Sequence, residues 1–193
     1  MKYCFLILTL LLSFHSVSAN EVSQIEQLVT EKIEVVIKLL KNKKINKQER
    51  NNKIIEVTMP IIDFERMVKL SLGQKTWNRI DAAQKKEFTQ IFLKRLQESY
   101  LDKLNRYTDE TVIIKNSSRE GNRIQVETDL VTKMGKIEIV YKFLKSQNKW
   151  KAYDAEIYGI SIVSLYRKQF YYHLKFNTFD SLIEKLKKQS LDL

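Results

Sequence analysis

Few residues of this chain could carry acid–base or nucleophilic chemistry. It contains two His and one Cys, and both Cys4 and His15 lie in an apolar N-terminal stretch. That leaves His173 as the histidine available to an active site. Asp154 and Glu156 project from one face of a predicted strand, and two carboxylates in a cleft can perform hydrolysis. A hydrolase or isomerase that uses Asp154 with His173 is one hypothesis, but alternating acids are also typical of a solvated sheet face.

Other common chemistries lack their ligands. A zinc or iron site built from Cys and His needs several such residues, whereas the chain after residue 19 has one His and no Cys. All four glycines fall at the ends of predicted elements, and none belongs to a Gly-rich phosphate loop. We therefore expect no metal, no cofactor and no catalytic step.

The N-terminus has the pattern of a secretory signal peptide. Lys2 precedes a short apolar run, and the small residues Val17 and Ala19 follow at the spacing that a signal peptidase reads. A membrane anchor is the alternative, but the run is shorter than the ~20 apolar residues that span a bilayer. We predict cleavage after Ala19 and one domain over residues 20–193, located beyond the inner membrane.

The net positive charge limits the classes of partner that this chain could bind. Loss of residues 1–19 removes one basic residue, Lys2, and no acid, so the net charge falls from +11 to +10. The basic residues are densest at 38–53 and 185–188, where they could contact nucleic acid or an anionic surface. Because export separates the chain from nucleic acid, we expect anionic lipid or acidic protein as partner.

Helical patterns occupy the first half of the chain. Apolar residues recur every three or four positions over residues 22–40. Asn46 and Glu49 have capping-box spacing for a second helix that ends at Met59, and Asp63 can cap a third that ends before Gly73. A second capping box at residues 81–84 starts a long fourth helix.

The period then changes to two. Four alternating segments between residues 112 and 158, joined by short turns, predict an antiparallel meander. Helical spacing returns over residues 162–174, and Thr178 can cap a last helix. Helices, then strands, then helices indicate an α+β fold with a sheet of about four strands covered by helices from both ends of the chain. Spacing alone does not distinguish a filled core from a lined cavity between sheet and helices.

Four blocks, in order, resemble the MlaC family, also called toluene-tolerance proteins. They are residues 60–73, residues 77–88, the run from Trp150 through Phe170, and residues 179–183. The third block is the most specific, although Tyr158 stands where the family usually has an acid before Gly159. The resemblance covers about residues 22–189.

The resemblance implies a periplasmic phospholipid carrier, a monomer whose cargo is held between sheet and helices. Such carriers move lipid between an outer-membrane lipoprotein–porin complex and an inner-membrane ABC transporter with an MCE-domain ring, and so maintain outer-membrane lipid asymmetry. Combined with the inward periodicity, it predicts lipid contact by sixteen residues: Phe64, Met67, Phe88, Phe92, Leu96, Tyr100, Val126, Leu130, Ile139, Tyr141, Tyr153, Ile157, Ile160, Val163, Tyr166 and Phe170. Three basic residues near the mouth, Arg66, Lys69 and Arg167, are weaker candidates for the headgroup. Besides the hydrolase or isomerase, a secreted chaperone or adaptor remains an alternative.

Overall fold

A computed structural model describes residues 4–104 and 110–188, with only the backbone described for residues 4–19. The helices that precede the sheet are α1 (Cys4–Lys41), α2 (Lys47–Thr58), the 3-10 turn η1 (Met59–Ile61), α3 (Phe64–Leu72), α4 (Gln74–Trp77) and α5 (Ala82–Leu104). The strands are β1 (Thr111–Glu120), β2 (Arg123–Thr132), β3 (Gly135–Ser146), β4 (Lys149–Ile157) and β5 (Ile160–Ser161). Two helices follow, α6 (Ile162–Phe176) and α7 (Phe179–Lys188).

The sheet is an antiparallel meander in the order β1-β2-β3-β4-β5. The α+β fold class is therefore confirmed, but the sheet has five strands, slightly more than the predicted count of about four. The added strand β5 spans only two residues, too few for an alternating pattern to be seen. It pairs with β4 because Tyr158 and Gly159 both take positive φ, 51° and 75°, and reverse the chain.

Side-chain caps start the helices where the sequence predicts them. Asn46 accepts a hydrogen bond from the Glu49 amide at 2.9 Å, and Asp63 accepts one from the Arg66 amide at 3.1 Å. At the start of α5, Asp81 and Gln84 form a complete capping box, with bonds of 2.8 and 3.1 Å. The short helix α4 was not predicted; it follows directly from Gly73, whose φ is 86°.

Two bulges bend the sheet. Lys115 in β1 and Tyr153 in β4 are extra residues without a direct partner on the neighbouring strand. A bulge adds local twist and shifts the alternation of side chains by one position. Tyr153 therefore breaks the simple inward–outward pattern that the sequence predicts for β4.

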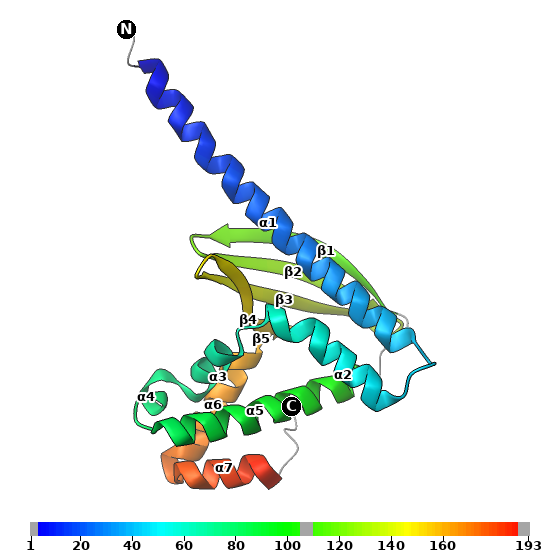
Figure 1. Cartoon of the computed structure of the whole chain (residues 1–193), viewed down its shortest axis with the longest axis vertical. Coiled ribbons are helices and arrows are strands. Elements are labelled where there is room, and N and C mark those ends of the chain that lie inside the picture. The colour runs from blue at the N-terminus through cyan, green and yellow to red at the C-terminus, as the bar shows by residue number, and fades with distance from the viewer. Residues whose placement is uncertain (1–3, 105–109, 189–193) are drawn as a thin grey trace.

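The C-terminal half of α1 lies across β1 and β2, and its N-terminal half projects away from the rest of the molecule (Figure 1). Apolar residues of α1 pack on the sheet, led by Ile25 and Val29 against Ile124, Val126 and Phe143. Within the described residues, no helix combines the length and hydropathy that a bilayer-spanning segment needs.

A cluster of ion pairs holds α1 against strands β1 and β3. Glu21 pairs with Arg119 at 2.6 Å and also with Lys145. Both cations also lie over the Trp150 ring, 5.6 and 5.9 Å from its centroid. The hydrogen bond from Lys145 holds the pKa of Glu21 below its usual value.

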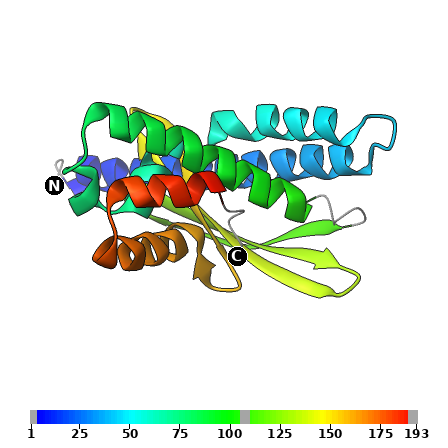
Figure 2. The ribbon, with the colours of Figure 1, turned by 90° about the horizontal axis from the view of Figure 1, so that it is seen from below.

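A second core fills the space between α3, α5, α6 and α7. Figures 1 and 2 show α5 and α7 running side by side, with α6 beside them. Phe88, Phe92, Tyr166 and Phe170 are at most 2% exposed there, and their ring centroids lie 4.9–5.8 Å apart in the pairs that contact. We call this cluster the aromatic core.

Candidate functional site

A cavity of about 350 Å³ lies between the sheet and the helices α1, α2 and α5. Its size falls within the range of ligand-binding pockets, about 300–1,000 Å³. Most of the lining is aliphatic or aromatic, so the cavity offers an apolar ligand a place out of water.

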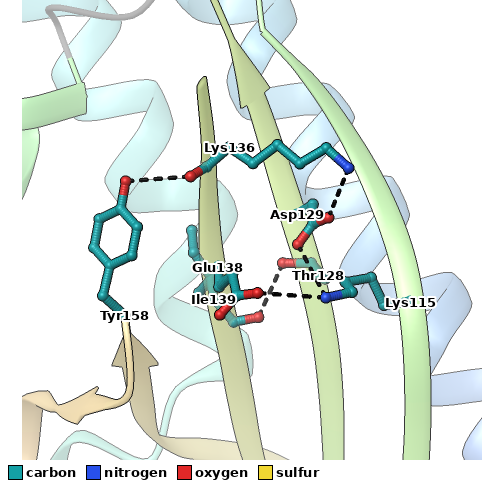
Figure 3. Close-up of polar contacts among 7 residues, drawn as sticks. All are labelled: Lys115, Thr128, Asp129, Lys136, Glu138, Ile139 and Tyr158. Atoms are coloured by element: carbon teal, nitrogen blue, oxygen red, sulfur yellow. Dashed lines mark hydrogen bonds and ion pairs between the residues drawn. The ribbon is translucent and has the colours of Figure 1, made fainter. Parts of the chain in front are cut away.

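Several polar groups of the lining are already satisfied by the protein. The Thr58 hydroxyl donates to the Ile54 carbonyl at 2.8 Å, and the Thr128 hydroxyl donates to the Ile139 carbonyl at 3.1 Å (Figure 3). Because these hydroxyls bond within the chain, they leave the cavity wall effectively apolar.

Two tyrosines of the lining keep their protons. Burial raises the pKa of Tyr141 to about 12, and burial also raises the pKa of Tyr100. Both phenols are therefore neutral at any physiological pH and contribute no charge to the cavity.

The structure brings together seven of the sixteen residues predicted to contact lipid. They come from α3, α5, β2 and β3, and all line the cavity: Phe64, Met67, Leu96, Tyr100, Leu130, Ile139 and Tyr141. The predicted lipid-contacting residues did not include the opposite wall of the cavity. It is formed by the facing sides of α1 and α2, with Val29, Ile33, Val36, Ile37, Leu40, Ile54 and Ile55. The stripe of apolar residues over 22–40 was visible in the sequence, but nothing in it indicated that this stripe faces a cavity.

Nine predicted residues lie elsewhere. Five pack in or against the aromatic core or are buried beside it: Phe88, Phe92, Val163, Tyr166 and Phe170. Val126 is buried beneath α1, and the remaining three, Tyr153, Ile157 and Ile160, lie at the β4–β5 end of the sheet. Ile160 is 59% exposed. None of the nine lines the cavity, because their inward spacing serves close packing or the sheet edge instead.

The three predicted headgroup residues are also outside the lining. Arg66 pairs with Asp63 at 3.0 Å, and Arg167 donates to the Leu70 carbonyl at 2.7 Å. Lys69 is half-buried in the last turn of α3. Arg66 and Arg167 thus fix local structure around α3.

The proposed acid and histidine are not brought together. Asp154 is 6% exposed, accepts hydrogen bonds from the Ser161 hydroxyl at 2.6 Å and the Val163 amide at 3.1 Å, and so connects β4 to the start of α6. His173 lies ten residues further along α6 than Val163, roughly 15 Å at 1.5 Å per residue. Glu156, the other carboxylate of the pair, is bound to Lys142. In the described part of the chain, no group of three or more His, Cys, Asp or Glu side chains could hold a metal ion.

A polar cluster occupies the sheet face opposite the cavity (Figure 3). Asp129 is 4% exposed and lies 3.4 Å from Lys136 and 3.7 Å from Lys115, which also contacts Glu138 at 3.4 Å. The nearby Asp129 carboxylate raises the pKa of Lys115. Beside this cluster, the Tyr158 hydroxyl donates to the Lys136 carbonyl at 3.3 Å, the contact made by the residue that departs from the family pattern. These charges neutralise one another and leave the outer face of β2 and β3 polar.

Comparisons with known proteins agree with this geometry. A structural search aligns the chain with the phospholipid-binding protein from Ralstonia solanacearum, solved in complex with a phospholipid, at a TM-score of 0.75 and 21% identity. The alignment covers 84% of this chain and 94% of that one, so the two share a fold. A de novo designed protein with a curved β-sheet aligns with a TM-score of only 0.28, at 8% identity over 32% of this chain and 59% of that one, and carries no argument. No curated protein matches in a sequence search. The model of the MlaC protein family matches residues 27–188, and the chain therefore belongs to the MlaC family.

Proposed function

We propose that this protein is a periplasmic phospholipid carrier without a catalytic step. The observation that carries the proposal is the apolar cavity of about 350 Å³ between the sheet and the helices α1, α2 and α5. Membership of the MlaC family supports it, as does the shared fold with a protein that was solved with a phospholipid bound.

The energetics of the cargo require such a cavity. Each acyl chain of ~16 carbons costs roughly 13 kcal/mol to expose to water, at ~0.8 kcal/mol per methylene. A carrier that crosses an aqueous space must therefore hide most of that length. A lining whose hydroxyls bond to the protein's own carbonyls suits this task, because it competes for no polar group of the cargo.

The full role that we propose is a shuttle. The protein would act as a monomer, receive lipid at an outer-membrane lipoprotein–porin complex and exchange it with an inner-membrane ABC transporter that bears an MCE-domain ring. This exchange would maintain the lipid asymmetry of the outer membrane. The N-terminal signal-peptide pattern supports a periplasmic location, and the family assignment supports the two partners.

Native mass spectrometry of the protein purified from cells tests the carrier. The expected result is a mass increment equal to a two-chain phospholipid. An empty protein that turns over ester or phosphate substrates would support the hydrolase instead, and an empty, inert protein would support an adaptor.

A pair of variants makes the test specific to the cavity. Tyr141→Glu places a charge in the lining and is expected to abolish the lipid increment, whereas Lys188→Glu changes an exposed residue of α7 and is expected to preserve it. Equal lipid content in both variants would contradict the assignment of the cavity.

A further inference from the structure

The outer face of α6 carries aromatic and basic side chains that no other element covers. The inner face of this helix, with Tyr166 and Phe170, is buried in the aromatic core. On the opposite side, five exposed residues recur at the three- and four-residue spacing of a single helix face: Lys168, Tyr171, Tyr172, Lys175 and Phe176. We call these five residues the α6 patch. Figure 2 shows α6 at an outer edge of the molecule.

The rings of the α6 patch are unusually accessible for aromatic side chains. Phe176 is 77% exposed, Tyr171 is 63% exposed and Tyr172 is 54% exposed. They contact one another or a cation: the ring centroids of Tyr171 and Tyr172 lie 5.7 Å apart, and the Lys175 ammonium lies 5.3 Å from the Phe176 centroid. Single exposed apolar residues are common, but a group of them on one face marks an interaction site.

Charge indicates the kind of partner. No acidic residue occurs between Glu156 and Asp180, so α6 presents its rings beside cations only. A second copy of the chain is disfavoured, because a two-fold interface would place the lysines of one patch against those of the other. The complementary partner is therefore anionic.

We propose that the α6 patch binds the surface of a bilayer that contains anionic phospholipid. Lysines near such a surface are attracted to its phosphates, and the long lysine stem lets the ammonium stay among the headgroups. Tyr and Phe rings bind at the boundary between headgroups and acyl chains, and one helix face that lies in the membrane plane suffices for this contact.

This inference goes beyond the proposed function. The cavity concerns what the protein carries, and of α6 only Ile162 lines it. The α6 patch concerns where the protein binds, so the two can be tested separately.

Flotation of the purified protein with two kinds of vesicle tests the patch. One kind contains phosphatidylcholine alone, and the other contains equal amounts of phosphatidylcholine and phosphatidylglycerol. The unmodified protein is expected to float with the mixed vesicles and to do so less as salt is added, because salt screens the lysines. All variants share the same N-terminal segment, so any binding by that segment cancels in the comparison.

Two double variants separate the cations from the rings. Lys168→Gln with Lys175→Gln should weaken binding to mixed vesicles about thirtyfold at low salt, the effect of two lysines near an anionic surface. Tyr171→Ser with Phe176→Ser should weaken it about tenfold at low and at high salt, because burial of apolar surface does not depend on screening.

Matched controls remove the same kinds of side chain elsewhere. Lys43→Gln with Lys44→Gln changes two exposed lysines in the turn between α1 and α2, and Met134→Ser changes a 99% exposed apolar residue between β2 and β3. Both should retain most of the binding, and circular dichroism should show all variants folded. Native mass spectrometry should find the same bound lipid in every variant, since none of these residues lines the cavity.

Three results would overturn the membrane-binding patch. They are undiminished binding by both α6 variants, an equal loss in the Lys43 and Lys44 control, and an unmodified protein that does not float with mixed vesicles. The second result would mean that net charge alone attracts the protein, and the third would favour an acidic protein surface as the partner. None of the three contradicts the carrier, whose evidence is the bound lipid.

Discussion

Two regions of this molecule are built from similar residues but packed in opposite ways. The aromatic core joins α3, α5, α6 and α7 with rings in direct contact, and its central side chains are almost completely inaccessible. The cavity lies along the C-terminal half of α5, where aliphatic side chains of α1 and α2 face the sheet without filling the space between them. Leu96 belongs to both, since it is buried in the core cluster and also lines the cavity.

The comparison indicates that the close-packed aromatic core supports the walls of the neighbouring cavity. An apolar space tends to collapse when its walls can relax inward. Here α5 contributes to one wall and is anchored by the aromatic core towards its N-terminal half, and the other wall, α1, is held by the ion pairs of Glu21 with Arg119 and Lys145. Rigid packing in one region therefore permits loose packing in the other.

The largest expected effect on the free energy of unfolding comes from creating a cavity in the aromatic core. Phe92 is 0% exposed and its ring contacts Phe88, Tyr166 and Phe170. Phe92→Ala should lower the free energy of unfolding by about 3–5 kcal/mol, because it removes buried ring surface and leaves a void. Urea denaturation measures this change, and a loss below about 1 kcal/mol would mean that this region is not close-packed.

Substitutions that enlarge a side chain should distinguish the aromatic core from the cavity lining most clearly. Val68 is 0% exposed in the aromatic core cluster, whereas Val36 lines the cavity. Val68→Phe overpacks the core and should cost about 1–3 kcal/mol in the free energy of unfolding. Val36→Phe has empty space available and should change that free energy little, while it reduces the amount of co-purified lipid. Equal destabilisation by the two substitutions, measured in the same urea titration, would contradict the distinction.

Asp154 lies at the border of the two regions, since it lines the cavity and binds the first turn of α6. Asp154→Ala should lower the free energy of unfolding by about 0.5–2 kcal/mol, the usual effect of losing a helix cap. Lipid content per folded molecule should be unchanged, because the carboxylate is used by Ser161 and Val163. Ser161 is the N-cap of α6 and also accepts a hydrogen bond from the Ser164 amide at 3.0 Å, so Ser161→Ala should cause a loss of similar size; unchanged stability in both variants would argue against a capping role.

The smallest expected effect is a pH dependence of the free energy of unfolding that arises from His173. Burial, aided by the nearby charge of Lys185, lowers the pKa of His173 below its ordinary value of 6.5. The unfolded chain thus binds a proton near pH 6.5 and the folded chain only at lower pH, so stability is lost as the pH falls below about 6.5. Urea titrations at pH 8, 7, 6 and 5 should show a shallower decline for His173→Gln than for the unmodified protein. Identical declines would show that His173 has the same proton affinity in both states.

Local features of this fold could be predicted from the sequence because they depend on neighbours along the chain. The caps at Asn46, Asp63 and Asp81 and the four long strands follow from short patterns, and the structure confirms them. What faces the cavity depends on contacts between distant segments. Phe92 and Ile139 are both inward and apolar, yet one fills a core and the other lines a cavity.

The cavity between α1, α2, α5 and the sheet also couples the stability of the protein to ligand binding. An unfilled apolar space forgoes attractive contacts that a bound tail would supply, so mass action favours the folded state whenever cargo is present. At a free ligand concentration one hundred times the dissociation constant, this linkage amounts to about 2.7 kcal/mol. Under the proposed function, the melting temperature of this protein would report how much lipid is bound, and a delipidated sample should melt at a lower temperature than one taken directly from cells.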